Sequence, residues 1–97
     1  SMKRADYIKQ QATILKKLCD QRDKKRSCDL MQLSPKQAQK RSADLNFLGM
    51  DIERTKERIA FGLGLLLPEN ARKEYRPSSF HRYDGIGKEL EKIKFED

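Results

Sequence analysis

Residues 34–61 read SPKQAQKRSADLNFLGMDIERTKERIAF. This stretch carries a helix-start signal and a row of apolar or small residues at helical spacing, which we call a seam. Ser34 can accept a hydrogen bond from a free backbone amide, and Pro35 suits the first helical position, where its missing N–H costs nothing. Gln37 stands at the capping-box distance from Ser34. Apolar or small side chains then recur in steps of three, four and seven, at Ala38, Leu45, Leu48, Ile52, Thr55 and Ile59. This pattern predicts one long helix over about 35–61.

The preceding arm, about 4–26, has no Gly or Pro and also follows helical spacing. Its predicted seam advances by three and four through Ala5, Ile8, Ala12, Leu15 and Cys19, and is widened by Ile14 and Leu18. Two helices of similar length joined by a short connection lie antiparallel. Gly49 costs its helix roughly 1 kcal/mol relative to Ala, and its small size would let another backbone approach closely there.

The chain after the predicted hairpin is less regular. The segment FGLGLLLP (61–68) is the most apolar in the protein, but two Gly and a Pro interrupt it. Ile86, Leu90 and Ile93 then stand at i, i+4 and i+7, which predicts a short helix over about 88–95. We therefore expect a single small helical domain over 1–97: an all-α hairpin, a loop-rich apolar segment over 62–87 and a short C-terminal helix.

Composition excludes several classes of protein. The 97 residues are 38% charged, with no Trp and, by count, no Val and two Thr, so an all-β fold is excluded. Leu, Ile and Phe number 21, enough for only a small core. The longest apolar run is far short of the ~20 residues that span a bilayer, so no membrane partner is expected. Cys19 and Cys28 make neither a disulfide framework nor a zinc site, and we predict no metal and no cofactor.

Positive charge is concentrated on the predicted hairpin. The net charge is +5 over residues 1–33, +2 over 34–61 and zero over 62–97. The cluster formed by Arg22, Lys24, Lys25 and Arg26 can attract phosphates, nucleic acid or an acidic protein groove. It can equally be a solvated face whose cations complement the dipole of the first helix.

Sequence signals for catalysis and for direct nucleic-acid recognition are weak. His81 is the only histidine, Asp84 follows three residues later, and nothing predicts a pocket around them. Cys28 has no neighbouring base, so no enzyme is predicted. Single-strand binders interleave aromatic rings with positive charge, yet only Tyr7 lies in the basic arm. The aromatic and basic run 75–83 could grip a backbone, but packing of the tail onto the hairpin explains it better.

The apolar segment allows two interpretations. It could fold over the open side of the hairpin and complete the core, or it could bind a partner, since contiguous exposed apolar surface usually marks an interface. The predicted partner-binding residues are the cluster Arg22, Lys24, Lys25 and Arg26 together with Leu63, Leu65, Leu66, Leu67 and Pro68. The Leu67–Pro68 bond can populate both isomers in a flexible loop, so Pro68 is also a candidate site for a host cyclophilin-type prolyl isomerase.

The segment from Phe61 to Asn70, together with the basic helical N-terminal half, resembles the small anti-RecBCD proteins of Salmonella lambdoid phages. The resemblance implies a non-catalytic protein of the host bacterial cytoplasm that binds the RecC subunit of RecBCD and inhibits or modifies the nuclease in favour of phage recombination. It supplies no catalytic residues. The alternative is a basic helical accessory protein that contacts nucleic-acid phosphates through its first helix, over residues 16–26. A homodimeric coil is a third possibility.

Overall fold

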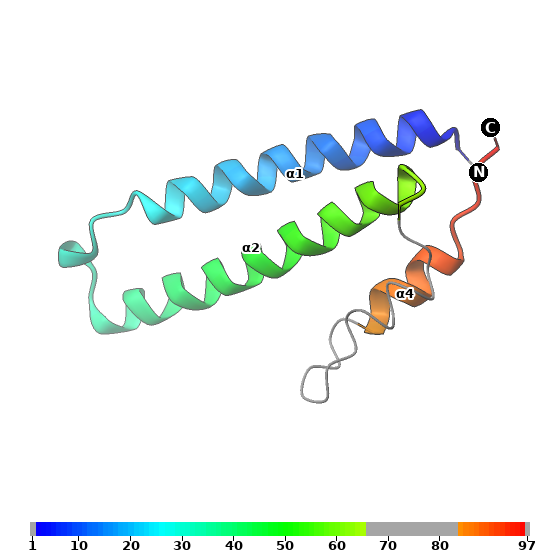
Figure 1. The fold of residues 1–97 in the computed structure, drawn as a ribbon. Coiled ribbons are helices and arrows are strands. Elements are labelled where there is room, and N and C mark those ends of the chain that lie inside the picture. The colour runs from blue at the N-terminus through cyan, green and yellow to red at the C-terminus, as the bar shows by residue number, and fades with distance from the viewer. Residues whose placement is uncertain (1, 66–83, 97) are drawn as a thin grey trace.

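The computed structural model of the chain describes residues 2–65 and 84–96. Its elements are α1 (Arg4–Arg26), the 3₁₀ turn η1 (Leu30–Gln32), α2 (Pro35–Gly62) and α4 (Asp84–Glu91). α1 and α2 lie antiparallel and side by side, with η1 at one end of the hairpin and both termini at the other (Figure 1). The predicted all-α architecture, a long hairpin followed by a short C-terminal helix, is confirmed.

The start of α2 forms as its sequence indicates. The backbone N–H of Gln37 donates to the Ser34 hydroxyl oxygen at 3.1 Å, and the N–H of Ser34 donates to the Gln37 side-chain oxygen at 2.9 Å. Pro35 occupies the first turn. The reciprocal pair satisfies two backbone donors that a helix start would leave open, so α2 begins at a sharply defined residue.

The contact face of α2 agrees with the predicted seam, and that of α1 agrees with it in part. Every residue of the α2 seam is buried or half-buried, with Ile52 and Thr55 the deepest at 2% and 1% exposed. On α1, the predicted residues that are half-buried are Ile8, Leu15, Leu18 and Cys19. The predicted Ala5, Ala12 and Ile14 are exposed, whereas Tyr7 and Gln11, which lie outside the predicted seam, are buried. The longer side chains of Tyr7 and Gln11 are buried at the start of α1, where the methyl groups of Ala5 and Ala12 are too short to fill the space. Spacing alone cannot distinguish these neighbouring faces of a helix.

The two helices lie close together at Gly62, the last residue of α2. A Cβ added there would lie 2.8 Å from Ile8 Cγ1 and 3.2 Å from Tyr7 Cδ1, whereas a Cβ at Gly49 would meet nothing within 4 Å. The close approach that the small size of Gly49 would allow is therefore not seen at that residue. Arg4 reinforces the real contact, because its Nη1 donates to the carbonyl oxygen of Gly62 at 3.0 Å.

α4 packs on the C-terminal part of α2. Ile86 and Leu90 are buried, at 3% and 0% exposed, and Phe61 and Ile93 pack against them. The Arg58 guanidinium donates to both carboxylate oxygens of Glu89, at 2.8 and 3.0 Å, and this bidentate pair fixes the orientation of α4.

The bounds of α4 differ from the expected 88–95, because the helix begins at Asp84 and ends at Glu91. It unwinds through tighter bonds, in which the N–H of Lys92 donates to the Glu89 carbonyl and that of Ile93 to the Leu90 carbonyl, both at 3.2 Å. The chain then extends beside the N-terminus. The helix thus ends at Glu91, although the apolar spacing continues to Ile93, because the tail pairs with the N-terminus instead.

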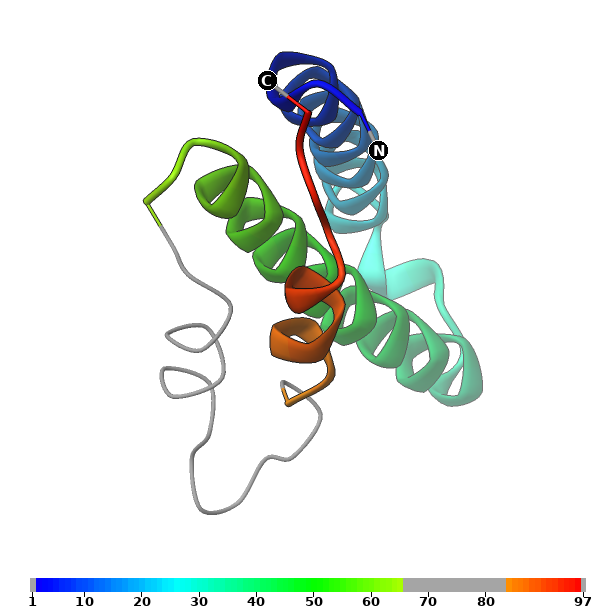
Figure 2. The same ribbon diagram turned by 90° about the vertical axis from the view of Figure 1, so that its right-hand side faces the viewer.

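The tail closes one end of the hairpin. Phe95 pairs with Met2 in an isolated parallel bridge, and its ring centroid lies 5.3 Å from that of Tyr7 and 5.7 Å from that of Phe61. The Arg4 guanidinium sits 4.4 Å from the Phe95 ring centroid, a cation–π contact. We call this region, where the start of α1, the end of α2 and residues 92–96 meet, the closed end (Figure 2).

Burial is confined to the closed end and α4. Within the described ranges, no residue from 12 to 51 is fully buried. The other half of the hairpin, which we call the turn end, is held by half-buried seam residues and polar contacts. None of the described helices is long and apolar enough to cross a membrane.

Candidate nucleic-acid interface

The turn end carries more than half of the net positive charge of the hairpin, which is +7 over residues 1–61. Residues 22–44 contain seven basic and three acidic side chains, a net charge of +4. Upstream on α1, Lys16 and Lys17 are exposed beside Lys24. These three lysines line a shallow depression of about 440 Å³, with Thr13, Asp20 and Gln21.

Lys24 and Lys25 link this depression to two others between the helices. One, of about 470 Å³, is lined by Gln21, Lys24, Lys25, Asp44, Phe47, Leu48 and Asp51. The other, of about 200 Å³, is lined by Lys25, Cys28, Leu33, Gln37, Lys40, Arg41 and Asp44. The shared lysines make the three hollows one continuous surface. We call it the basic band, and its cations are Lys16, Lys17, Lys24, Lys25, Lys40 and Arg41.

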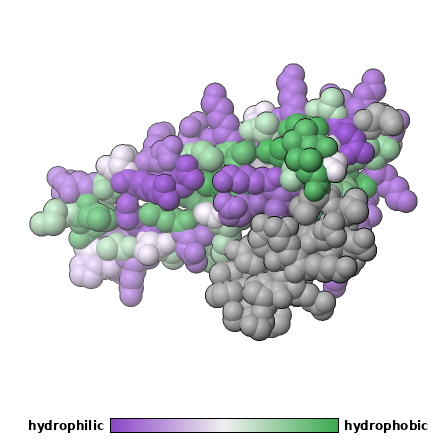
Figure 3. All heavy atoms as spheres, in the orientation of Figure 1, coloured by the Kyte–Doolittle hydropathy of each residue, from purple (hydrophilic) through white to green (hydrophobic). Residues whose placement is uncertain are grey.

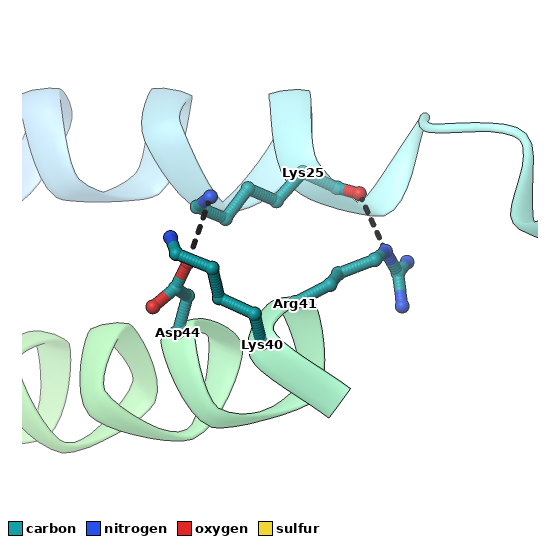
Figure 4. Close-up of polar contacts among 4 residues, drawn as sticks. All are labelled: Lys25, Lys40, Arg41 and Asp44. Atoms are coloured by element: carbon teal, nitrogen blue, oxygen red, sulfur yellow. Dashed lines mark hydrogen bonds and ion pairs between the residues drawn. The ribbon is translucent and has the colours of Figure 1, made fainter. Parts of the chain in front are cut away.

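A carboxylate clamp holds the middle of the basic band (Figure 4). Asp44 Oδ2 lies 3.2 Å from Lys25 Nζ and 3.1 Å from Lys40 Nζ, so one acid binds cations from both helices. Arg41 Nε donates at 3.0 Å to the backbone carbonyl oxygen of Lys25 at the end of α1, which also accepts from the backbone N–H of Cys28 at 3.4 Å. The hydrogen bonds from Lys40 and then Lys25 hold the pKa of Asp44 below its ordinary value.

The four cations predicted to form a cluster at the end of α1 differ in exposure and in their partners. Lys24 and Arg26 are exposed. Lys25 is held by the clamp, and Arg22 is half-buried with its Nε 3.3 Å from Asp23 Oδ1. Lys24 and Arg26 therefore meet solvent directly, while Arg22 and Lys25 also contribute to the local structure.

The structure adds an aromatic ring that the sequence analysis missed. Phe47 is 62% exposed and lines the same hollow as Lys24, although it comes from α2. A search along the basic arm could not find it, because the ring and the lysine are 23 positions apart and meet only when the hairpin closes. Aromatic rings beside positive charge suit unpaired bases, which stack on such faces.

The other predicted site residues lie partly outside the described ranges. Leu63 and Leu65 follow α2 and are 55% and 77% exposed. Leu66, Leu67 and Pro68 lie outside the described residues, as do His81 and most of the aromatic run 75–83. The role of the apolar segment in partner binding thus stays a prediction.

Anion binding is the chemistry that the described side chains support. Cys19 is half-buried and Cys28 exposed, both as free thiols. In residues 2–65 and 84–96, no group of three or more His, Cys, Asp or Glu side chains could hold a metal ion. The fold and the basic band together define a small basic helical protein with a cationic surface.

The family follows from comparison with known proteins. The model of the phage N antitermination protein family matches residues 1–87, and the chain belongs to this family. Members are non-catalytic regulators, so the expectation that the protein is not an enzyme is confirmed. Comparison with curated proteins and with solved structures gave no match.

This match overturns the resemblance to anti-RecBCD proteins. The interpretation as a RecBCD inhibitor was wrong, and with it the predicted partners, namely RecC and a cyclophilin-type isomerase at Pro68. The expectation that nucleic-acid contact is only weak or indirect is corrected as well. The resemblance depended on an apolar segment and a basic helical half, features that many small helical binding proteins share. The alternative of a basic nucleic-acid-binding protein agrees better with the family.

Proposed function

We propose that the protein is an RNA-binding transcription antiterminator whose basic band contacts the phosphates of a nascent transcript. The observation that carries this proposal is the continuity of the band, which joins cations of α1 and α2 through Lys24 and Lys25. The family implies boxB RNA and the host RNA polymerase with its Nus factors as partners. The place of action is then the host cytoplasm.

The chemistry of the band suits RNA with unpaired bases. Exposed lysines neutralise phosphates and release bound counterions, which supplies affinity without sequence specificity. Sequence-specific RNA recognition targets loops and bulges, whose bases can stack on aromatic rings. Lys24 and Phe47 lie in one hollow, so the phosphate backbone and a splayed base can be held side by side.

RNA binding also explains how a protein without catalytic groups can influence transcription. A protein bound to the transcript is tethered to the polymerase that is making it, which raises its effective concentration at that enzyme. A second surface must then contact protein. The exposed Leu63 and Leu65, at the opposite end of the hairpin from the turn, are our candidates for this contact.

Fluorescence anisotropy with a labelled boxB-type hairpin from the phage's own leader transcript tests RNA binding. Replacing Lys16, Lys17 and Lys24 together with Glu should raise Kd by at least about tenfold and lower the salt slope by about 2 to 3, because three phosphate contacts are lost. The control replaces Lys56, Lys88 and Lys92 with Glu, the same charge change outside the band. Equal weakening by both triple variants would contradict the proposal.

Read-through of a terminator, measured with purified host polymerase and Nus factors, tests antitermination itself. The triple band variant should lose most read-through. Leu63→Ser with Leu65→Ser should reduce read-through while the Kd for RNA stays within about twofold. Absence of read-through by the unaltered protein on a transcript that carries its hairpin would refute the antitermination role.

A further inference from the structure

The hollow of the basic band that contains Phe47 also contains two carboxylates, those of Asp44 and Asp51. Asp44 is engaged in the clamp between the helices (Figure 4). The side chain of Asp51 is 55% exposed, and its Oδ1 lies 3.9 Å from Arg54 Nη1. This separation is too long for a strong hydrogen bond, so the carboxylate of Asp51 can accept hydrogen bonds from a ligand.

Asp51 lies beside an aromatic ring and shares its hollow with hydrogen-bond donors. Phe47, which is 62% exposed, stands four positions before it on α2, a spacing that makes two side chains neighbours on one face of a helix. Gln21 and Lys24 line the same hollow from α1. Figure 3 shows hydrophobic side chains between the helices of the hairpin, bordered by hydrophilic ones. The hollow, of about 470 Å³, is large enough for a purine base.

A carboxylate within a phosphate-binding surface indicates where the phosphates do not lie. Like charges repel, so the backbone of a bound RNA is disfavoured next to Asp51. The lysines of the hollow disfavour a cationic side chain of a partner protein for the same reason. An unpaired base carries no net charge, and it can stack on Phe47 while its edge faces the carboxylate.

The hydrogen-bonding groups of the bases decide which one suits the hollow. An ionised carboxylate is an acceptor only, with two oxygens. The Watson–Crick edge of guanine places N1–H and N2–H side by side, two parallel donors that match those oxygens. Adenine and cytosine present one amino group beside an acceptor nitrogen, and uracil presents one N–H between two carbonyl groups. Unpaired bases are recognised on this edge, so an acidic group there favours guanine.

We propose that Asp51 is a specificity-determining residue, which selects an unpaired guanine stacked on Phe47. Its two oxygens accept from N1–H and N2–H of the base, and the side-chain amide of Gln21 donates to O6. This inference rests on the proposed function, since RNA binding by the band brings the base to the hollow. It adds sequence discrimination, supplied by α2, to phosphate contacts that are indifferent to sequence.

Fluorescence anisotropy with variants of the phage's boxB-type hairpin tests this recognition. Each unpaired base is replaced in turn by guanine, by adenine and by inosine, which is guanosine without the N2 amino group. At one position, the hairpin with guanine should bind at least about tenfold more tightly than the hairpin with adenine, as expected for a bidentate contact. The hairpin with inosine should fall between them, because it keeps N1–H and loses the second donor.

Asp51→Asn should remove the preference for guanine. An amide offers one acceptor in place of two, so the Kd values for the adenine and guanine hairpins should come within about twofold of each other. Glu53→Gln removes the same charge from α2 outside the hollow, and should keep the preference. The ratio of the two Kd values is the measure, because loss of a negative charge can tighten the binding of every RNA. A preference that survives in Asp51→Asn, with unchanged circular dichroism, would overturn the inference.

The same measurements separate this inference from the proposed function. Salt-dependent binding of every hairpin, whatever its unpaired bases, would overturn guanine recognition and leave RNA binding by the band intact. Binding of none of the hairpins would overturn both. Phe47→Ala should raise Kd at least about fivefold for each hairpin, because every base can stack on a ring. An unchanged Kd in that variant would show that no base lies on Phe47, and would overturn the inference as well.

Discussion

At the scale of single residues, Asp44 has two opposing effects. Its carboxylate joins Lys25 and Lys40 across the hairpin, at 3.2 and 3.1 Å. It also places a negative charge within the surface that we propose binds phosphates. A phosphate that approaches the band must compete with Asp44 for both lysines, so the same side chain supports the fold and limits RNA affinity.

Asp44→Asn should therefore tighten RNA binding. Removing one negative charge from the band and releasing two ammonium groups should lower Kd by about two- to fivefold at low salt, an effect that salt screens. Glu53→Gln is the matched control, because Glu53 also pairs with a lysine, Lys56, at 3.3 Å but lies outside the band. Anisotropy measures both variants, and weaker RNA binding by the Asp44 variant would show that the clamp positions the lysines for RNA.

The lowered pKa of Asp44 also predicts how stability depends on acidity. A carboxyl whose folded pKa lies below its ordinary 3.8 stabilises the fold in full above that pH. The contribution is lost as pH falls below 3.8 through the lower folded pKa. Thermal unfolding followed by circular dichroism should therefore give a higher Tm for the unaltered protein than for Asp44→Asn at about pH 6. The difference between the two Tm values should shrink as the pH is lowered to about 2. A gap that stays constant with pH would contradict this.

At the scale of elements, α2 organises the molecule. α1 packs on its seam, α4 packs near Phe61, and the tail crosses its C-terminal end. The sequence is sufficient to predict this helix, because a capping box and a regular seam are local signals. It cannot predict which face of α1 meets α2, because Ala5 and Tyr7 lie on neighbouring stripes and only the partner surface selects between them.

The two glycines of α2 provide a matched test of this packing. Gly62→Ala should lower the free energy of unfolding by about 1–3 kcal/mol, because its Cβ would press on Ile8 at 2.8 Å. Gly49→Ala should raise it by roughly 0.5–1 kcal/mol, since the methyl group meets nothing and alanine favours the helix. Urea unfolding measures both, and stabilisation by Gly62→Ala would mean that the helices can separate at no cost.

At the scale of the whole molecule, the structural core and the proposed RNA-binding surface lie at opposite ends. The aromatic rings, Gly62 and the buried part of α4 gather at the closed end, whereas residues 12–51 contain no fully buried side chain. The basic band belongs to the less packed half, whereas Leu63 and Leu65 follow α2 at the closed end. Regions with few buried contacts open more readily, so a partner can adjust them at little cost.

Hydrogen exchange should reveal this asymmetry. Amides of residues 52–62 should exchange at least about tenfold more slowly than those of 38–48, because opening the closed end requires unpacking its buried side chains. Saturating boxB-type RNA should slow exchange at the turn end and leave the closed end nearly unchanged. Uniform protection along α2 in the free protein would show that the hairpin opens as one unit.

The sequence by itself determined the helical class, the start of α2, its seam and the excess of positive charge on the hairpin, because each depends on side chains three or four positions apart. The apolar segment and the basic composition did not identify the family correctly, because unrelated small binding proteins share both features.

Only the tertiary structure brought Phe47 to Lys24, placed Asp44 between two lysines and let Phe95 close the other end. The physical reason is that these contacts join residues far apart in the chain. Their geometry depends on how two helices rotate against each other, and local spacing does not record that rotation.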